Sequence, residues 1–435
     1  MKKLKFLIVL LIAFMVLPVV ANAEKYFDAK SGILYGGTLD DTLSDIDFFS
    51  DGSYVVVGNT KSTYRNITNL DEPKTMGVIA IYDKDNTLIH EYNYDEIAYS
   101  VDPGTTTLSQ VLVLDDTNFV VCGAHSSSSF CAKVTTSGER VWNTPLAASV
   151  QGVGLKIDKN SMEIIKTSDN HILVMNYTIN NEIYKIDLEG NVVYTIDSLN
   201  VNSLIETDDY YVLGGNESDR AILYLINKND GTVADTIYTA IPSVEVSDIE
   251  KITDGYIVTT RLSLGGHSKL VVIDVADEGN KEYELGYPAY NTETMLLGDG
   301  NVLVIATKSD TPSSSYVIML DSNLNAISQK EFKFEQEFSI HDVAISPVNN
   351  NFYFVGQTKA ALNGQTNMGE TDGFIMSYAF AEPTPASDID TTSSEEDVKN
   401  PNTGMFISLI VTTGFLVLIG ASIVITNKRN KLYKI

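Results

Sequence analysis

The fragment SYVVVGNT at residues 53–60 decides the fold, because six related fragments follow it along the chain. Each is a run of β-branched and aromatic residues, and six of the seven closely follow an Asp or Asn turn signal, a combination typical of β-strands. The other six are NFVVCGAH (118–125), HILVMNYT (171–178), YYVLGGNE (210–217), GYIVTTRL (255–262), NVLVIATK (301–308) and NFYFVGQT (351–358). They recur about every 50 residues, close to the ~40–50 residues of a four-stranded propeller blade, so the sequence predicts seven repeats.

Further strands flank each fragment. In the first repeat IDFF (46–49) precedes it, and VIAIYDKDN (78–86) and LIHEYNY (88–94) follow it. Four short strands per repeat, with turns between them and no helical periodicity, favour radial antiparallel sheets over a sandwich.

The seventh repeat indicates how the ring closes. It has no fourth strand after GFIMSYA (373–379), whereas GILYGGT (32–38) near the N-terminus is a spare strand. Pairing the two would cover an otherwise exposed sheet edge. We therefore predict an all-β, seven-bladed β-propeller over residues 24–380, built of four-stranded antiparallel blades and closed by the N-terminal strand.

Glycine, acidic and aromatic residues recur at fixed places in the repeats, most clearly in GGTLDDTLSDIDFFSDGSYVVVGNT followed by GVIAIYDKDNTLIHEY. This pattern resembles the repeat of secreted bacterial β-propeller proteins. The matching residues are Gly36, Gly37, Asp51, Gly52, Tyr54 and Gly58, with Gly138 and Trp142 in the second repeat and Asp372, Gly373 and Phe374 in the last. The resemblance implies a propeller that acts as a binding or scaffold module.

Both ends of the chain carry segments that address it to the cell surface. Residues 1–23 have an early lysine cluster, an apolar run and the small-residue ending Ala21-Asn22-Ala23, as a secretory signal peptide does. Residues 405–426 carry no charge and are long enough for a single transmembrane helix. The basic tail 427–435 predicts a cytoplasmic end, which places the propeller outside the cell.

A linker and a short motif precede this span. Residues 381–399 are rich in Pro, Ser, Thr and acids, so we predict a disordered linker. Asn400, Pro401, Asn402, Thr403 and Gly404 form NPNTG, which resembles the Leu-Pro-any-Thr-Gly sorting signal of Gram-positive wall proteins, with Asn400 in place of Leu. The resemblance implies cleavage after Thr403 by a sortase-type transpeptidase and attachment to peptidoglycan. The alternative is a plain single-span membrane anchor.

The net charge bears on the partners of the protein, and the cysteines bear on its disulfide bonding. The formal net charge is −27, so the surface would repel nucleic acid. The only cysteines are Cys122 and Cys131, which align on neighbouring strands of one hairpin. Two interpretations stay open, a cross-strand disulfide and a pair of buried thiols.

No catalytic, metal or cofactor motif is apparent. The five His residues have no ligand spacing, and neither a nucleophile elbow nor a phosphate-binding loop occurs. Asp321–Asn325 and Asn227–Gly231 resemble the start of calcium loops but lack the required Gly and Glu positions, so we interpret both as strand-connecting turns. The acids Asp40, Asp41, Asp45, Asp47 and Asp51 are interpreted as turn and blade-edge residues.

Three long loops are expected to emerge on one face. They are residues 61–76, 359–371 and the crossover 95–108, which belong to the first and last repeats and so adjoin in a closed ring. The predicted ligand-binding patch consists of Tyr64, Arg65, Asn66, Tyr99, Asn363 and Asn367. The leading hypothesis is a non-enzymatic surface module that binds an extracellular protein or glycan. The alternatives are a surface enzyme acting on carbohydrate in the central pocket, marked by acids there without structural partners, and a passive structural coat protein.

Overall fold

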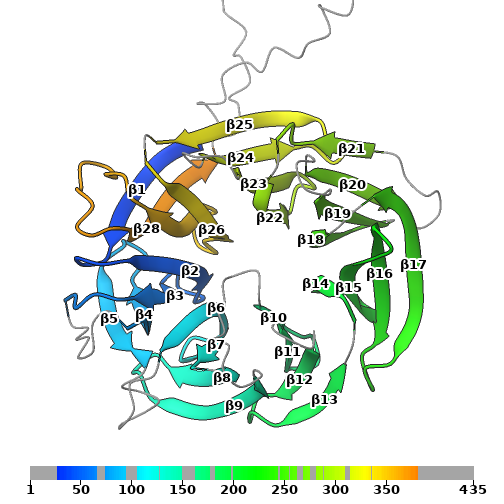
Figure 1. The fold of residues 1–435 in the computed structure, drawn as a ribbon, viewed down its shortest axis with the longest axis horizontal. Helices are drawn as coiled ribbons and strands as arrows, with labels where there is room; N and C mark the ends of the chain where they lie inside the picture. Colours follow the sequence, from blue (N-terminus) through cyan, green and yellow to red (C-terminus); the bar gives the residue numbers. More distant parts are fainter. Residues whose placement is uncertain are drawn as a thin grey trace, which may run out of the picture. The chain divides into compact units, whose positions relative to one another are not determined.

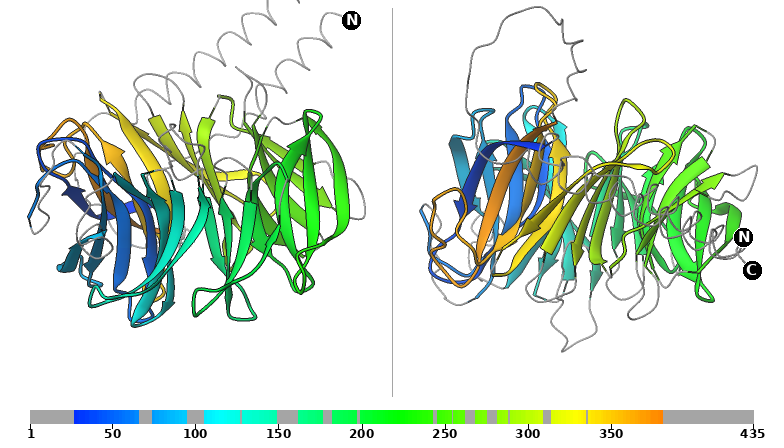
Figure 2. Two further views of the ribbon diagram at one scale, coloured as in Figure 1. Left: turned by 60° about the horizontal axis from the view of Figure 1, so that its bottom comes forward. Right: turned by 90° about the horizontal axis from the view of Figure 1, so that it is seen from above.

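Seven four-stranded antiparallel sheets form a closed ring in the computed structural model (Figure 1). The chain divides into two units, Met1–Pro383 and Thr384–Ile435, and all described residues belong to the first. The structure describes residues 27–65, 74–94, 105–126, 128–148, 162–176, 182–196, 199–242, 245–253, 255–261, 268–274, 281–287, 289–308, 314–334 and 336–380. In side view the strands of each blade run between the two faces of the ring (Figure 2). The predicted seven-bladed propeller is confirmed.

Each blade uses four strands that are consecutive in the chain, except the last. Blade 1 contains β2 (Asp41–Phe48), β3 (Tyr54–Thr60), β4 (Met76–Tyr82) and β5 (Leu88–Asn93). Blade 2 contains β6 (Thr106–Asp115), β7 (Asn118–His125), β8 (Ser128–Thr135) and β9 (Arg140–Ala148). Blade 3 contains β10 (Met162–Lys166), β11 (His171–Asn176), β12 (Glu182–Asp187) and β13 (Val192–Ile196). Blade 4 contains β14 (Val201–Glu206), β15 (Tyr210–Glu217), β16 (Arg220–Asn227) and β17 (Val233–Pro242).

The remaining blades follow the same order. Blade 5 contains β18 (Glu245–Ile252), β19 (Gly255–Arg261), β20 (Lys269–Asp274) and β21 (Lys281–Glu284). Blade 6 contains β22 (Ala289–Leu296), β23 (Val302–Lys308), β24 (Ser314–Leu320) and β25 (Ala326–Lys333). Blade 7 contains β26 (Phe338–Ile345), β27 (Phe352–Thr358), β28 (Asp372–Phe380) and, as its fourth strand, β1 (Phe27–Tyr35). The predicted N-terminal closure is therefore confirmed, with Ile33 opposite Ile375.

All seven fragments of the repeat are second strands, namely β3, β7, β11, β15, β19, β23 and β27. They are almost continuously apolar because both faces pack against neighbouring blades; Val55, Val56 and Val57 of β3, for example, have no exposed surface. Two predicted loop ends are wrong by a few residues. Met76 is already the buried first residue of β4, β5 ends at Asn93 and β6 begins at Thr106, so the connections are 61–75 and 94–105.

An aromatic residue on the outer strand of blades 1 to 3 fastens each blade to the next. Tyr92, Trp142 and Tyr194 each donate a hydrogen bond, of 2.9, 2.9 and 3.0 Å respectively, to a backbone carbonyl in the next blade's outer turn. The ring of each lies over that turn's glycine, where an added Cβ would collide with it; these glycines are Gly138, Gly190 and Gly231. All three glycines have positive φ, a backbone conformation that side chains disfavour. The spacing of glycine and aromatic residues in the repeat is thus a contact between successive blades.

Cys122 on β7 and Cys131 on β8 lie directly opposite each other and form a disulfide, with their Cα atoms 4.2 Å apart. The signal segment 1–23, the linker 381–399, NPNTG at 400–404, the predicted span 405–426 and the tail 427–435 lie outside the described residues. Within the described ranges, no helix has the length and apolarity needed to cross a membrane.

Candidate functional site

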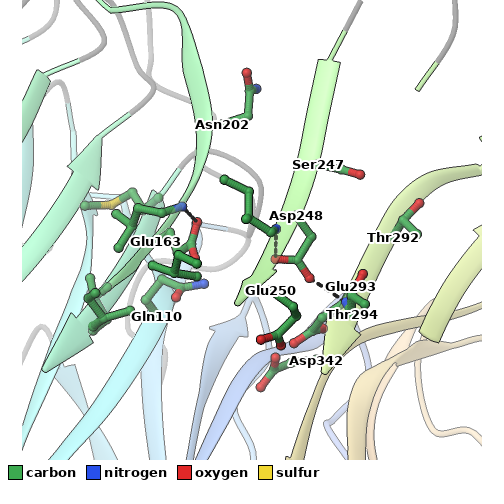
Figure 3. A pocket seen from close by; sticks show the side chains of 16 residues that line it. Gln110, Glu163, Asn202, Ser247, Asp248, Glu250, Thr292, Glu293, Thr294 and Asp342 are labelled. Carbon is green, nitrogen blue, oxygen red and sulfur yellow. Dashed lines mark hydrogen bonds between the residues drawn. The ribbon is translucent and has the colours of Figure 1, made fainter. Parts of the chain in front are cut away.

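A cavity of about 300 Å³ opens at the centre of the ring, between the inner strands of blades 2 to 7 (Figure 3). Five carboxylates line it: Glu163, Asp248, Glu250, Glu293 and Asp342. Its other lining residues, as far as the structure describes them, include no Lys, Arg or His. The volume lies at the lower end of the range of about 300–1,000 Å³ typical of small-molecule sites.

Acidic side chains on the inner strands also join successive blades. An inner strand has no neighbouring strand on its channel side, so N–H groups on that edge need other acceptors. Carboxylates of the preceding blade supply them. Asp342 accepts from Ile46 (3.1 Å), Asp45 from Val111 (2.7 Å), Asp47 from Val113 (2.6 Å), Glu163 from Leu204 (3.1 Å), Asp248 from Thr294, and Glu250 from Leu296 (3.1 Å).

Acids occupy one register position in five of the seven inner strands. Asp45, Glu163, Asp248 and Asp342 occupy one matching register position in the odd-numbered blades. In the even-numbered blades the position is occupied by Gln110, Ser203 and Glu293. In five of the seven inner strands a bulge immediately precedes this position, and such a bulge redirects the side chain that follows it.

Two of the channel carboxyls have pKa values well above the ordinary range. Burial, and then the nearby Asp248 carboxylate, raises the pKa of Glu250 to about 7. Burial raises the pKa of Asp47 to about 6, although N–H groups of Val113 and Phe48 act in the opposite direction. Glu250 therefore changes charge close to neutral pH.

A second candidate site lies where the ring closes, around the Gly36–Asp41 segment that joins β1 to β2. Asp41 is buried and accepts hydrogen bonds from the Gly37 N–H (2.7 Å), the Ser62 hydroxyl (3.0 Å) and the Thr60 hydroxyl. Its own N–H donates to the carbonyl of Thr371 (2.7 Å). One segment thus contacts the roots of both loops predicted to adjoin.

The patch residues on the first of these loops form a stack. The Tyr64 and Tyr35 rings are 5.6 Å apart and nearly perpendicular. The Arg65 guanidinium lies 4.6 Å from the Tyr64 ring centroid and 6.0 Å from that of Tyr35. Arg65 has φ of 52°, a region that non-glycine residues adopt only when their surroundings hold them there.

The second loop, residues 359–371, presents its patch residues differently. Asn363 and Gly364 form a two-residue turn between Leu362 and Gln365, and the Asn363 amide lies against Gly32 of β1. The Asn367 amide bonds inward, donating to the Thr358 carbonyl (2.8 Å) and accepting from the Gly369 N–H (3.0 Å). Asn66 and Tyr99 lie outside the described residues.

The two calcium-like segments are turns, as predicted. The Asp321 carboxylate accepts the N–H groups of Asn323 (2.8 Å) and Asn325 (2.9 Å) in the turn between β24 and β25. Asn227–Gly231 lies in the turn between β16 and β17, below Tyr194. In the part of the chain that the structure describes, no group of three or more His, Cys, Asp or Glu residues could hold a metal ion.

The channel acids were missed in the sequence. Asp51 is a turn residue as expected, with its carboxylate accepting the Ser53 N–H (2.9 Å). Asp45 and Asp47 lie on β2, the edge strand of blade 1 nearest the channel, so the blade-edge interpretation is confirmed for them. Their hydrogen bonds to blade 2 were not predicted. The sequence does contain a signal for these acids. Ser44-Asp45-Ile46 recurs at the same place of the repeat as Ser247-Asp248-Ile249, and a related triplet, His341-Asp342-Val343, occurs there in the last repeat.

Comparison with solved structures supports the fold. The chain is similar to the WD40 β-propeller domain of Doa1, with a TM-score of 0.51, 13% identity, and coverage of 81% of this chain and 97% of that domain. The C-terminal WD40 domain of Sif2 gives a TM-score of 0.48 and 11% identity over 81% of this chain and 99% of its own. A protein of unknown function from Bacteroides caccae gives 0.38 and 13% over 59% of this chain and 91% of its own. No family model and no curated protein matches the sequence. At such low identity the likeness is one of fold alone.

Proposed function

We propose that this chain is an exported, non-enzymatic surface protein that displays its propeller as a binding or adhesion module. Three features of the sequence support a location at the cell surface: the leader 1–23, the NPNTG motif and the apolar segment 405–426. The Cys122–Cys131 disulfide is consistent with an oxidising compartment. The ligand is an extracellular protein or glycan, and the anchor is peptidoglycan through Thr403 or the membrane through 405–426.

One observation carries the binding role: parts of two long loops, distant in sequence, are held against the same segment at the closing junction. Lys61 bonds to Asp40 through both its backbone N–H (3.0 Å) and its ammonium group (2.8 Å), and Asp40 pairs with Thr371 of the other loop. Loops supported by a rigid scaffold commonly carry recognition. The stack of Arg65 on Tyr64 supplies the residue types enriched in binding hot spots.

The enzyme alternative receives little support from the channel. Asp248, Glu163, Glu250 and Asp342 all accept backbone N–H groups of the next blade, which is a structural task. A glycosidase pair would need both carboxylates available to the scissile bond.

Ligand capture by cells displaying the full chain tests the binding role. On arrays of extracellular matrix proteins and glycans, we expect a specific signal that falls at least about tenfold in the double variant Tyr64→Ala, Arg65→Ala. Tyr238→Ala is the control, because this tyrosine is 72% exposed on β17, away from the closing junction. No signal for the wild type would favour a passive coat protein, and an equal loss in both variants would contradict the patch.

A release assay tests the anchor separately. Muramidase is expected to free a protein that lacks residues 405–435, and Thr403→Ala is expected to shift the chain to the detergent-soluble membrane fraction. Release of the full-length wild type by detergent alone would show a membrane anchor instead.

A further inference from the structure

Three polar groups of the central cavity have no partner in the described part of the chain. The Gln110 side chain is only 7% exposed and Thr292 only 8%, and neither makes a side-chain hydrogen bond there. Glu250 uses Oε1 for the Leu296 N–H, whereas its Oε2 has no partner among the described residues. None of these atoms is completely buried, so all three are open to a partner in the cavity.

The charge of the cavity defines what that partner is. Carboxylates approach from β10, β18, β22 and β26, and no cationic residue is among the described residues of the lining. Figure 3 shows the labelled carboxylates and the Gln110 amide extending into the space between the inner strands. The oxygens of Glu250, Gln110 and Thr292 are acceptors, and an ammonium group offers three donors and no acceptor.

The distribution of these groups distinguishes an organic cation from a metal ion. The three acceptors come from blades 5, 2 and 6, and no metal-holding cluster occurs in the described ranges. The lining also includes apolar residues, among them Met162, Ile165 and Ile205. Acceptors on separate blades, in a cavity that also has apolar lining, match amino groups joined by methylene segments.

We propose that the central cavity binds an aliphatic di- or polyamine, with Glu250 as the principal counter-ion and Gln110 and Thr292 as hydrogen-bond acceptors. This site is separate from the loop patch at the closing junction, so either proposal can fail without the other.

Proton linkage gives the proposal a characteristic signature. The titratable groups that line the cavity with Glu250 are all acidic: Asp248 on its own strand, Glu293 on β22, Asp342 on β26 and Glu163 on β10. Because its pKa is raised to about 7, Glu250 is mostly protonated at pH 6 and mostly ionised at pH 8. Binding of a cation that requires the ionised form should weaken about tenfold from pH 8 to pH 6 and release a proton at the lower pH.

Titration calorimetry of the full-length protein in non-ionic detergent, at 150 mM salt, tests this. The probe is 1,4-diaminobutane, whose two amines stay protonated between pH 6 and 8. We expect one site per chain with the stated pH dependence. Glu250→Gln keeps an acceptor for the Leu296 N–H, and should weaken binding at pH 8 at least about tenfold and abolish the pH dependence. Gln110→Met is expected to weaken binding by a smaller factor.

Two controls separate a site from general attraction by an acidic protein. Glu139→Gln removes the same charge from an exposed turn and should leave affinity within about twofold. The neutral probe 1,4-butanediol should not bind. Unchanged binding in a folded Glu250→Gln variant, or equal competition by Mg²⁺, would overturn the proposal.

Discussion

At the scale of single residues, the molecule places several carboxyl groups where burial opposes their ionisation. Asp41 at the closing junction has a pKa raised to about 6 by burial, despite three donors that favour its charged form. Asp47 and Glu250 behave alike in the channel, with values of about 6 and about 7. Asp169 shows the opposite behaviour: burial raises its pKa, but the Lys185 ammonium and the Thr167 hydroxyl outweigh burial and hold the pKa at about 2.

These residues predict that the propeller loses stability as pH rises through the neutral range. A carboxyl whose folded pKa lies above its unfolded value binds its proton more tightly when folded, so its stabilisation is present below about pH 4 and is lost by about pH 7. Groups such as Asp169 titrate below pH 4 and do not affect this window. Thermal melts should therefore show a higher Tm at pH 5 than at pH 8, and the difference should shrink in Glu250→Gln and Asp47→Asn. A Tm that rises with pH in the wild type would contradict this assignment.

At the scale of elements, contacts between successive blades explain most of the repeat. The aromatic residue of an outer strand and the turn glycine of the next blade form one contact, and the channel acid and the next inner strand form another. The first contact is visible in the sequence because the glycine and the aromatic residue recur at fixed places in the repeat. The second was not predicted, since an Asp beside a strand is usually a turn residue.

Removal of the Trp142 side chain should weaken the junction of blades 2 and 3. Trp142→Ala eliminates the Nε1 bond to Leu188 and the packing over Gly190. We expect a loss of about 2–4 kcal/mol in the free energy of unfolding, measured by urea denaturation. The adjacent Val141→Ala is the matched control: Val141 is 52% exposed, so its loss should stay within about 0.5 kcal/mol. Equal effects of the two changes would contradict the contact.

At the scale of the whole molecule, the number of blades and the mode of closure followed from the sequence, whereas the cavity did not. The strand fragments specify a period, and the spare strand at the N-terminus specifies the partner of β28. The cavity depends on side chains from six blades meeting across the ring, which no local pattern records. The loop patch was predicted in part. Closure of the ring implied that the two loops adjoin, whereas the inward hydrogen bond of Asn367 could not be predicted from the sequence.

Closure by β1 should determine whether the ring assembles as one cooperative unit. Leu34 is 4% exposed and packs in the core of blade 7. Leu34→Asp would bury an unpaired charge there, detach β1 and expose the edge of β28. We expect a lower Tm and concentration-dependent aggregation by light scattering, whereas Lys30→Asp, on an exposed position of the same strand, should behave as the wild type. A monomeric Leu34→Asp variant with unchanged Tm would show that the ring closes without this strand.

The position of β28 between two partners also determines how the protein bears load. Tension applied through the chain beyond Phe380 enters the propeller at this strand, which is bonded to β27 on one side and to β1 on the other. As an edge strand it could be peeled away one hydrogen bond at a time. Held on both sides, it distributes the pull over two ladders at once, as the proposed anchoring through the C-terminal residues would require.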